Sequence, residues 1–187
     1  MNKKRFYIIT GFIALAALSR VLPHPYNFTP LGAIALFGSA YFTDKKWAIL
    51  MPLLAMWISD LVLNNFIYSG FYEGFTLLTP AMFWVYGSLI LIALLGMKVL
   101  KKVTIPRLLG SALSASIIFF IVSNFGAWLA SPVYPATLEG LIACYTAAIP
   151  FFHNTLGGDL IYCATLFGAF EFVTMRYPEL KEAAVRV

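Results

Sequence analysis

Hydrophobic residues run along this chain in long segments that are separated by short polar, Pro-containing or Gly-containing connections. A helix that crosses a bilayer needs about 20 mostly apolar residues. The pattern predicts an all-α membrane protein with six transmembrane helices, and a single integral membrane domain over residues 1–187. The predicted spans cover residues 6–22, 31–42, 47–64, 80–100, 108–130 and 151–175.

Two segments need separate treatment. Thr29 followed by Pro30 predicts the N-cap and first residue of the second span. The apolar stretch from Ala136 to Ile149 is too short to cross a bilayer, and one more span would move the basic C-terminal tail to the other side. We therefore expect a short interfacial or re-entrant helix there, before the last span.

Charge is distributed unevenly between the two sides of the predicted bundle. Cytoplasmic loops of membrane proteins carry an excess of Lys and Arg. Only Arg20 lies on the opposite side from the other basic residues, so we expect a multi-pass protein of the bacterial inner membrane with cytoplasmic N- and C-termini. The start, Met1 to Ser19, resembles a signal peptide, but the charge pattern favours an uncleaved first span. The basic residues of the predicted inner side are Lys3, Lys4, Arg5, Lys45, Lys46, Lys98, Lys101, Lys102, Arg107, Arg176, Lys181 and Arg186.

Composition agrees with this picture. The chain is 61% hydrophobic and 11% charged, whereas a soluble domain carries roughly 25% charged residues. The net charge of +5 lies in the predicted inner connections. We interpret it as a topology signal and a contact with the lipid bilayer, and we expect no nucleic-acid partner.

Polar side chains inside the predicted spans gather in the outer half of the bundle, where they predict a cup open to the outside, since lipid cannot satisfy them. A structural pair, Arg20–Asp60 or Arg20–Asp159, is the strongest alternative. Asn124 is equally compatible with a hydrogen bond between helices. The candidate substrate-binding residues are Arg20, His24, Asn27, Asp60, Asn64, Asn124, Trp128, His153, Asn154 and Asp159.

Two further patterns have two interpretations each. The second outer loop carries five aromatic residues between Phe66 and Phe75, which suit an interfacial belt or a lid over an apolar ligand. Small residues from Gly110 to Ser116 suit internal packing or a docking face for a membrane partner.

Several chemistries lack their sequence motifs. The chain has no G-x-x-x-x-G-K-[ST], no H-E-x-x-H and no G-x-S-x-G. Cys144 and Cys163 show neither metal-site nor redox spacing. We expect no enzyme activity, no cofactor and no resident metal.

The segment Ser19–Gly38 (SRVLPHPYNFTPLGAIALFG) resembles the opening signature of a family of small bacterial membrane proteins of unknown function, described as candidate transport proteins. Met51–Asp60, Ser123–Trp128 and Cys144–Asp159 are similar to later segments of that family.

More distantly, the layout resembles the substrate-binding S components of energy-coupling factor (ECF) vitamin transporters. That resemblance implies capture of a small molecule from the outer side and, as partners, an ECF T subunit and ATPase subunits. S components often dock their T subunit through Ala-xxx-Ala pairs in span 1, and Gly11, Ala14, Ala16 and Ala17 give no such clean pair. A corrinoid-binding relative ligates cobalt with a cysteine, for which Cys163 is the nearest counterpart.

The resulting hypothesis is uptake of a small, vitamin-like substrate through a pocket formed by spans 1, 3, 5 and 6. Two alternatives stay open. One is a solitary proton-coupled secondary transporter, in which Asp60 and Asp159 titrate during the cycle. The other is a non-transport structural or assembly protein that binds a membrane partner through span 5.

Overall fold

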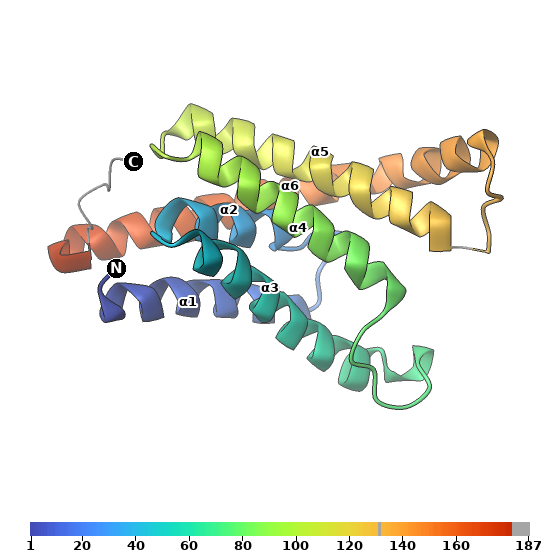
Figure 1. The fold of residues 1–187 in the computed structure, drawn as a ribbon, viewed down its shortest axis with the longest axis horizontal. Coiled ribbons are helices and arrows are strands. Elements are labelled where there is room, and N and C mark those ends of the chain that lie inside the picture. Colours follow the sequence, from blue (N-terminus) through green and yellow to red (C-terminus); the bar gives the residue numbers. More distant parts are fainter. Residues whose placement is uncertain (131, 181–187) are drawn as a thin grey trace.

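The computed structural model describes residues 1–130 and 132–180, and within these residues all regular secondary structure is helical (Figure 1). Short 3-10 turns follow α1 and α6, and a π-helical turn, Leu63–Ile67, extends α3. The predicted fold class, an all-helical protein, is confirmed. The six α-helices of the described residues are α1 (Lys3–Leu18), α2 (Leu31–Tyr41), α3 (Lys45–Val62), α4 (Pro80–Val99), α5 (Ile105–Ala130) and α6 (Leu138–Arg176).

Four of these helices are long and apolar enough to cross a membrane. They are α3 with its π turn, α4, α5 and α6. The helix α1 has 16 residues, and α2 has only 11. The chain is therefore built as a membrane-embedded helical protein, while the count of six complete crossings stays a prediction.

The last helix corrects the predicted segment Ala136–Ile149. This stretch is not a separate interfacial or re-entrant helix, because α6 runs without a break for 39 residues from Leu138 to Arg176. Pro150 lies inside it. The first turns of α6 pack on α5: the Tyr145 hydroxyl donates to Ile121 O (2.6 Å) and Cys144 Sγ contacts Asn124 O (3.5 Å). A helix of this length spans about 58 Å, so it exceeds a bilayer of about 40–45 Å.

The short helix α2 lies at the centre of the bundle and packs against all five other helices. Every residue from Leu31 to Ser39 is buried, as expected of a helix that is apolar on all sides. Glycines allow the close approach: a Cβ on Gly38 would lie 3.0 Å from Pro52 Cγ of α3, and a Cβ on Gly96 of α4 would overlap Ser39. The loop after α1 must therefore carry the chain back into the middle of the bundle before α2 begins.

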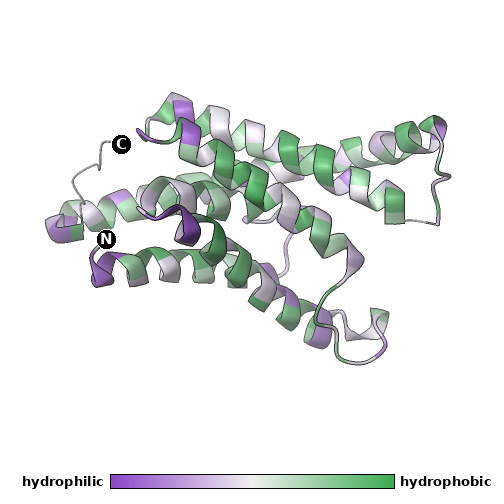
Figure 2. Ribbon diagram, in the orientation of Figure 1, coloured by the Kyte–Doolittle hydropathy of each residue, from purple (hydrophilic) through white to green (hydrophobic). Residues whose placement is uncertain are grey.

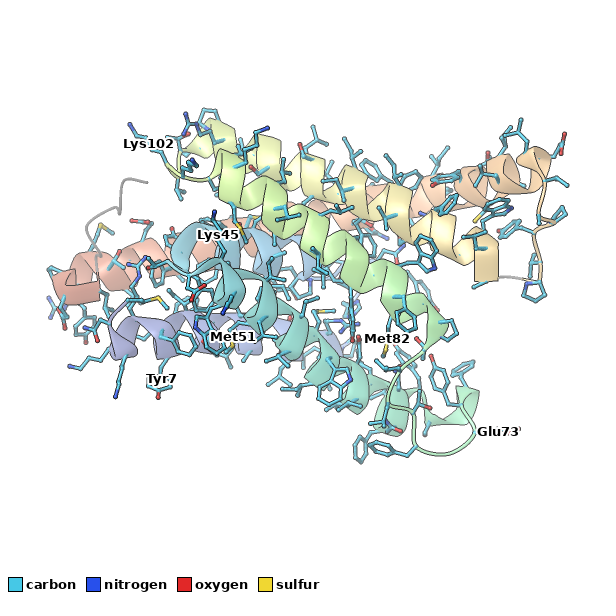
Figure 3. All side chains as sticks on the ribbon, in the orientation of Figure 1. Tyr7, Lys45, Met51, Glu73, Met82 and Lys102 are labelled. Carbon is cyan, nitrogen blue, oxygen red and sulfur yellow. The ribbon has the colours of Figure 1, made fainter. Side chains whose placement is uncertain are left out.

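The helices run alternately between two ends of the bundle. Figure 3 places Lys45 and Lys102 toward one end, called the basic end below, and Glu73 at the opposite end. Figure 2 shows hydrophilic residues concentrated near the helix ends, with hydrophobic ones between them. At the basic end Arg5 of α1 donates to the backbone oxygens of Leu180 and Tyr41. The start of the chain and the 3-10 turn Pro178–Leu180 after α6 thus lie at the same end, as an even number of passes requires.

Candidate functional site

A largely buried ion pair joins the turn after α1 to α3, and a side chain of α4 completes it. Arg20, in the 3-10 turn after α1, donates from Nη1 to Asp60 Oδ1 (2.7 Å) and to Ser59 Oγ (2.6 Å). The Tyr86 hydroxyl donates to the second carboxylate oxygen, Asp60 Oδ2 (2.7 Å). Both oxygens of Asp60 are therefore occupied by protein donors. The Arg20–Asp60 pair, one of the predicted alternatives, is confirmed, and it needs this neutralisation because an unpaired charge within a span is expensive.

His24 continues this network into the loop after α1. Its Nε2 lies 3.2 Å from Arg20 O, and its Nδ1 lies 2.9 Å from Pro25 O. The ring thus bridges the end of the first helix and the chain that turns back into the bundle. In this structure His24 orients the loop.

Asp159 of α6 caps the beginning of α2. Its Oδ1 accepts from the backbone N–H of Ala33 (3.2 Å), and its Oδ2 accepts from the Ser116 hydroxyl of α5 (2.7 Å). Asp159 is 2% exposed, and a Cβ on Gly32 would overlap its carboxylate. A carboxylate at a helix N-terminus satisfies free N–H groups and complements the helix dipole.

This contact corrects the predicted start of α2. The helix begins at Leu31 after Pro30, and no side chain of its own segment makes a capping hydrogen bond, so Thr29 is not the N-cap. The cap comes from α6, far away in sequence. A short buried helix without a local cap needs such a partner, because its first N–H groups lie where water and lipid headgroups cannot reach.

A cavity of about 240 Å³ opens between α4, α5 and α6 in the half of the bundle away from the basic end. Within the described chain, no charged side chain lines it. Its walls combine four aromatic residues, Trp84, Phe119, Phe120 and Phe152, with small residues such as Ala127 and Ala148. Its polar groups come from Asn27, Ser123, Asn124 and Thr155.

Two of these polar groups have donors or acceptors without a hydrogen-bond partner among the described residues. The Asn124 amide donates from Nδ2 to Phe120 O (2.7 Å), which leaves Oδ1 with no partner among the described residues. Thr155 is 7% exposed, and its side-chain hydroxyl has no hydrogen-bond partner in the part of the chain that the structure describes. Hydroxyls elsewhere on α6 behave differently, since Thr146 and Thr165 both donate to carbonyls of their own helix. Thr155 therefore lines the cavity with a hydroxyl that can donate to or accept from a bound molecule.

The loop before α2 forms one rim of the cavity. Asn27 lines the cavity and has a left-handed backbone (φ 62°), a conformation that Asn tolerates better than most residues. The loop packs closely on α6: a Cβ on Gly158 would lie 3.0 Å from both the N and O atoms of Thr29. Two neighbouring glycines on α6, Gly157 and Gly158, thus give the loop room to enter the bundle.

The ten predicted substrate-binding residues do not form one cup. Asn27 and Asn124 line the cavity, while Arg20, His24 and Asp60 form the ion-pair network, and Asp159 holds α2. Asn64 is buried at the end of α3, the Trp128 indole donates to Pro135 O (2.9 Å), His153 is exposed and Asn154 is partly buried; none of these four lines the cavity.

Sequence reasoning missed the role of α4. The predicted pocket used spans 1, 3, 5 and 6, but Trp84 of α4 lines the cavity and Tyr86 of α4 completes the Asp60 network. The loop from Asn65 to Thr79 does not line the cavity either. Its Phe71 is 84% exposed, and Figure 3 places Glu73 of this loop beyond the α3–α4 end. In the sequence, an aromatic residue that lines a cavity and one that faces lipid follow the same apolar helical pattern. The pattern therefore could not identify Trp84 as a cavity residue.

Metal ligands do not gather in the part of the chain that is described: no group of three His, Cys, Asp or Glu residues could hold an ion there. Cys144 and Cys163 are both buried free thiols.

Comparison with known proteins gives one finding. No curated protein and no solved structure matches this chain. One family, described as "Family of unknown function (DUF6580)", matches residues 1–180. Since this match spans nearly the whole chain, the protein belongs to that family.

Proposed function

We propose that this protein binds a small neutral molecule in the cavity between α4, α5 and α6 and takes part in its uptake. The observation that carries the proposal is the cavity itself, which Thr155 lines with a hydroxyl that has no hydrogen-bond partner among the described residues. Polar groups inside proteins are almost always satisfied by protein or by ordered water, and a ligand that replaces such a water must offer the same hydrogen bond. Aromatic walls with a few convergent polar groups are typical of small-molecule sites.

The chemistry of the walls limits the ligand. Because no described charged residue lines the cavity, an ionic ligand would find no counter-charge there. Arg20, Asp60 and Asp159 are nearby ionisable groups, and each is already paired with protein groups. Asn124 Oδ1 requires a donor, and Thr155 can donate or accept. A neutral ring with an N–H or O–H group fits both the polar positions and the aromatic walls.

The volume of the cavity limits the size of the ligand. Drug-sized ligands occupy pockets of roughly 300–1,000 Å³, and this cavity holds about 240 Å³. The ligand is therefore a small, compact molecule. The resemblance to ECF S components leads us to expect a vitamin-like substrate. Only the smaller molecules of that class would fit a cavity of about 240 Å³.

The proposed direction of uptake follows from the charge rule. The basic end is cytoplasmic if positive residues stay inside, so the cavity faces outward. An S-component-like mode, with an ECF T subunit and ATPase subunits as energy source, is our first proposal. The chain has no phosphate-binding loop of its own, so ATP-driven uptake would need such partners.

Native mass spectrometry of the gently purified protein tests ligand binding. We expect a small molecule to remain bound to the wild type and to be lost from Ala148→Leu, which fills the cavity. The matched control is Ala147→Leu, since Ala147 is exposed and does not line the cavity. Retention of the same mass by Ala148→Leu would overturn the assignment of the cavity.

A second pair of variants tests the hydrogen bond. Thr155→Val keeps the shape of the side chain but removes its hydroxyl, so we expect ligand affinity to fall about tenfold. Thr146→Val is the control, because Thr146 donates to its own helix outside the cavity. Uptake of the identified compound by cells with and without the gene then tests transport, and unchanged uptake would contradict that part of the proposal.

A further inference from the structure

A second hollow lies at the other end of the bundle. An apolar groove of about 500 Å³ runs between the first half of α5 and the last half of α6. Its walls include Leu108, Ala112, Leu160 and Phe167, and Gly168 leaves its side open, since a Cβ there would meet nothing within 4 Å. This groove shares no lining residue with the outer-half cavity.

Charges of both signs flank the end of this groove nearest the basic end. On one side, Val103, Thr104 and Ile105 line it, and the exposed Lys102 and Arg107 flank these three residues in the chain. Arg107 Nη1 lies 3.4 Å from Lys102 O, so its guanidinium folds back over the connection between α4 and α5. Lys102 lies toward the basic end in Figure 3.

The opposite side of the groove carries one carboxylate. Glu171 of α6 lines the groove and is exposed. Its Oε1 accepts from the Tyr41 hydroxyl (2.9 Å), and no other partner is found for it among the described residues. The hydrogen bond to Tyr41 holds the carboxylate beside the groove, while its second oxygen has no partner among the described residues.

We propose that this groove seats a phospholipid with a primary ammonium headgroup, such as phosphatidylethanolamine. One acyl chain occupies the apolar groove, Lys102 and Arg107 bind the phosphate, and Glu171 binds the ammonium group. The two cationic side chains can donate charge-assisted hydrogen bonds to the negative phosphate, and the carboxylate can accept one from the positive ammonium group. An anionic lipid could bind Lys102 and Arg107 through its phosphate. It has no positive group to pair with the Glu171 carboxylate.

The same charges argue against a partner helix as the occupant. A transmembrane helix of a partner protein would need its own charges of both signs at one depth, whereas the lipid carries them in every headgroup. Basic pockets between membrane helices on the cytoplasmic side are known lipid sites. The proposal is independent of the ligand cavity, because the two sites lie in opposite halves of the bundle.

Native mass spectrometry with added lipid tests this inference. The delipidated full chain in detergent is mixed with equal amounts of phosphatidylethanolamine, phosphatidylglycerol and phosphatidylcholine of identical acyl chains. We expect phosphatidylethanolamine adducts to exceed each of the other two by at least threefold. Glu171→Gln should remove this preference, while its amide oxygen can still accept from Tyr41.

Two matched pairs of variants complete the design. Gly168→Leu fills the groove and should reduce all retained lipid, whereas Gly110→Leu, at another open glycine outside the groove, should not. Lys102→Gln with Arg107→Gln should weaken binding of every phospholipid, whereas Lys45→Gln with Lys46→Gln should leave it unchanged. Equal retention of the three lipids, preference for phosphatidylglycerol, or a preference that survives in Glu171→Gln would each overturn the proposal.

Discussion

At the scale of single residues, Asp159 is the side chain on which the central helix depends. Asp159→Ala removes the acceptor for Ala33 N–H in a place that water cannot reach. We expect a loss of about 2 kcal/mol in the free energy of unfolding. Asp159→Asn keeps an acceptor for Ala33 and should lose less than about 1 kcal/mol. Thermal unfolding in detergent measures both, and equal losses would contradict the capping role.

Arg20 and Asp60 offer a second residue-scale test. Removing either partner leaves a buried charge uncompensated, so Arg20→Met and Asp60→Leu should each cost about 3 kcal/mol of unfolding free energy. The double variant should cost clearly less than the sum, with a coupling energy of about 2 kcal/mol. The same unfolding assay checks this. Additive costs would mean that the pair contributes nothing beyond its separate contacts.

The sequence predicted these residues better than it predicted their partners. Asp60 and Asp159 stood out because a carboxylate within a span is costly, and Arg20 because it breaks the charge asymmetry. The sequence could not show that Asp159 meets the backbone of α2, because that contact joins positions 126 residues apart. Thr155 was equally hidden, since a missing hydrogen bond leaves no pattern in the chain.

At the scale of helices and loops, the entry of the loop before α2 into the bundle depends on one glycine. A Cβ on Gly158 would press on the backbone of Thr29, which cannot move aside as a side chain can. Gly158→Ala should therefore cost about 1–3 kcal/mol of unfolding free energy. At Gly157 the nearest atom is Phe28 Cε2 at 3.8 Å, so Gly157→Ala is the matched control and should cost little. Equal stability of the two variants would contradict this account of the packing.

Helix ends were easier to predict than helix continuity. The bounds predicted for the fourth span, 80–100, agree with Pro80–Val99, because Thr79 and Pro80 mark the start and the basic connection marks the end. The prediction failed at α6. The stretch Ala136–Ile149 is too short to cross a bilayer by itself, and the charge pattern argues against one more span, but α6 continues through Pro150 into the last span. Hydrogen bonds from Tyr145 and Cys144 to α5 support the extra turns, and these tertiary contacts leave no periodic signal.

At the scale of the whole molecule, the bundle separates two kinds of surface. The basic end carries the lysines and the lipid groove, and the other half carries the ligand cavity and the aromatic loop. Between them lie the hydrogen-bonded carboxylates of Asp60 and Asp159 and the buried, apolar helix α2. This division gives uptake a direction only if the basic end faces the cytoplasm.

Labelling of introduced cysteines in intact cells tests that orientation. We expect Glu73→Cys to react with a membrane-impermeant maleimide added outside, because Glu73 is exposed at the end opposite the lysines. Lys45→Cys and Lys102→Cys should react only after the membrane is permeabilised, since the basic end is predicted to be cytoplasmic. The native Cys144 and Cys163 are 4% and 2% exposed, so the unmodified chain is the control for background labelling. Labelling of Lys102→Cys from outside would show that the orientation is the reverse of the one predicted. The cavity would then face the cytoplasm and serve export or internal sensing instead of uptake.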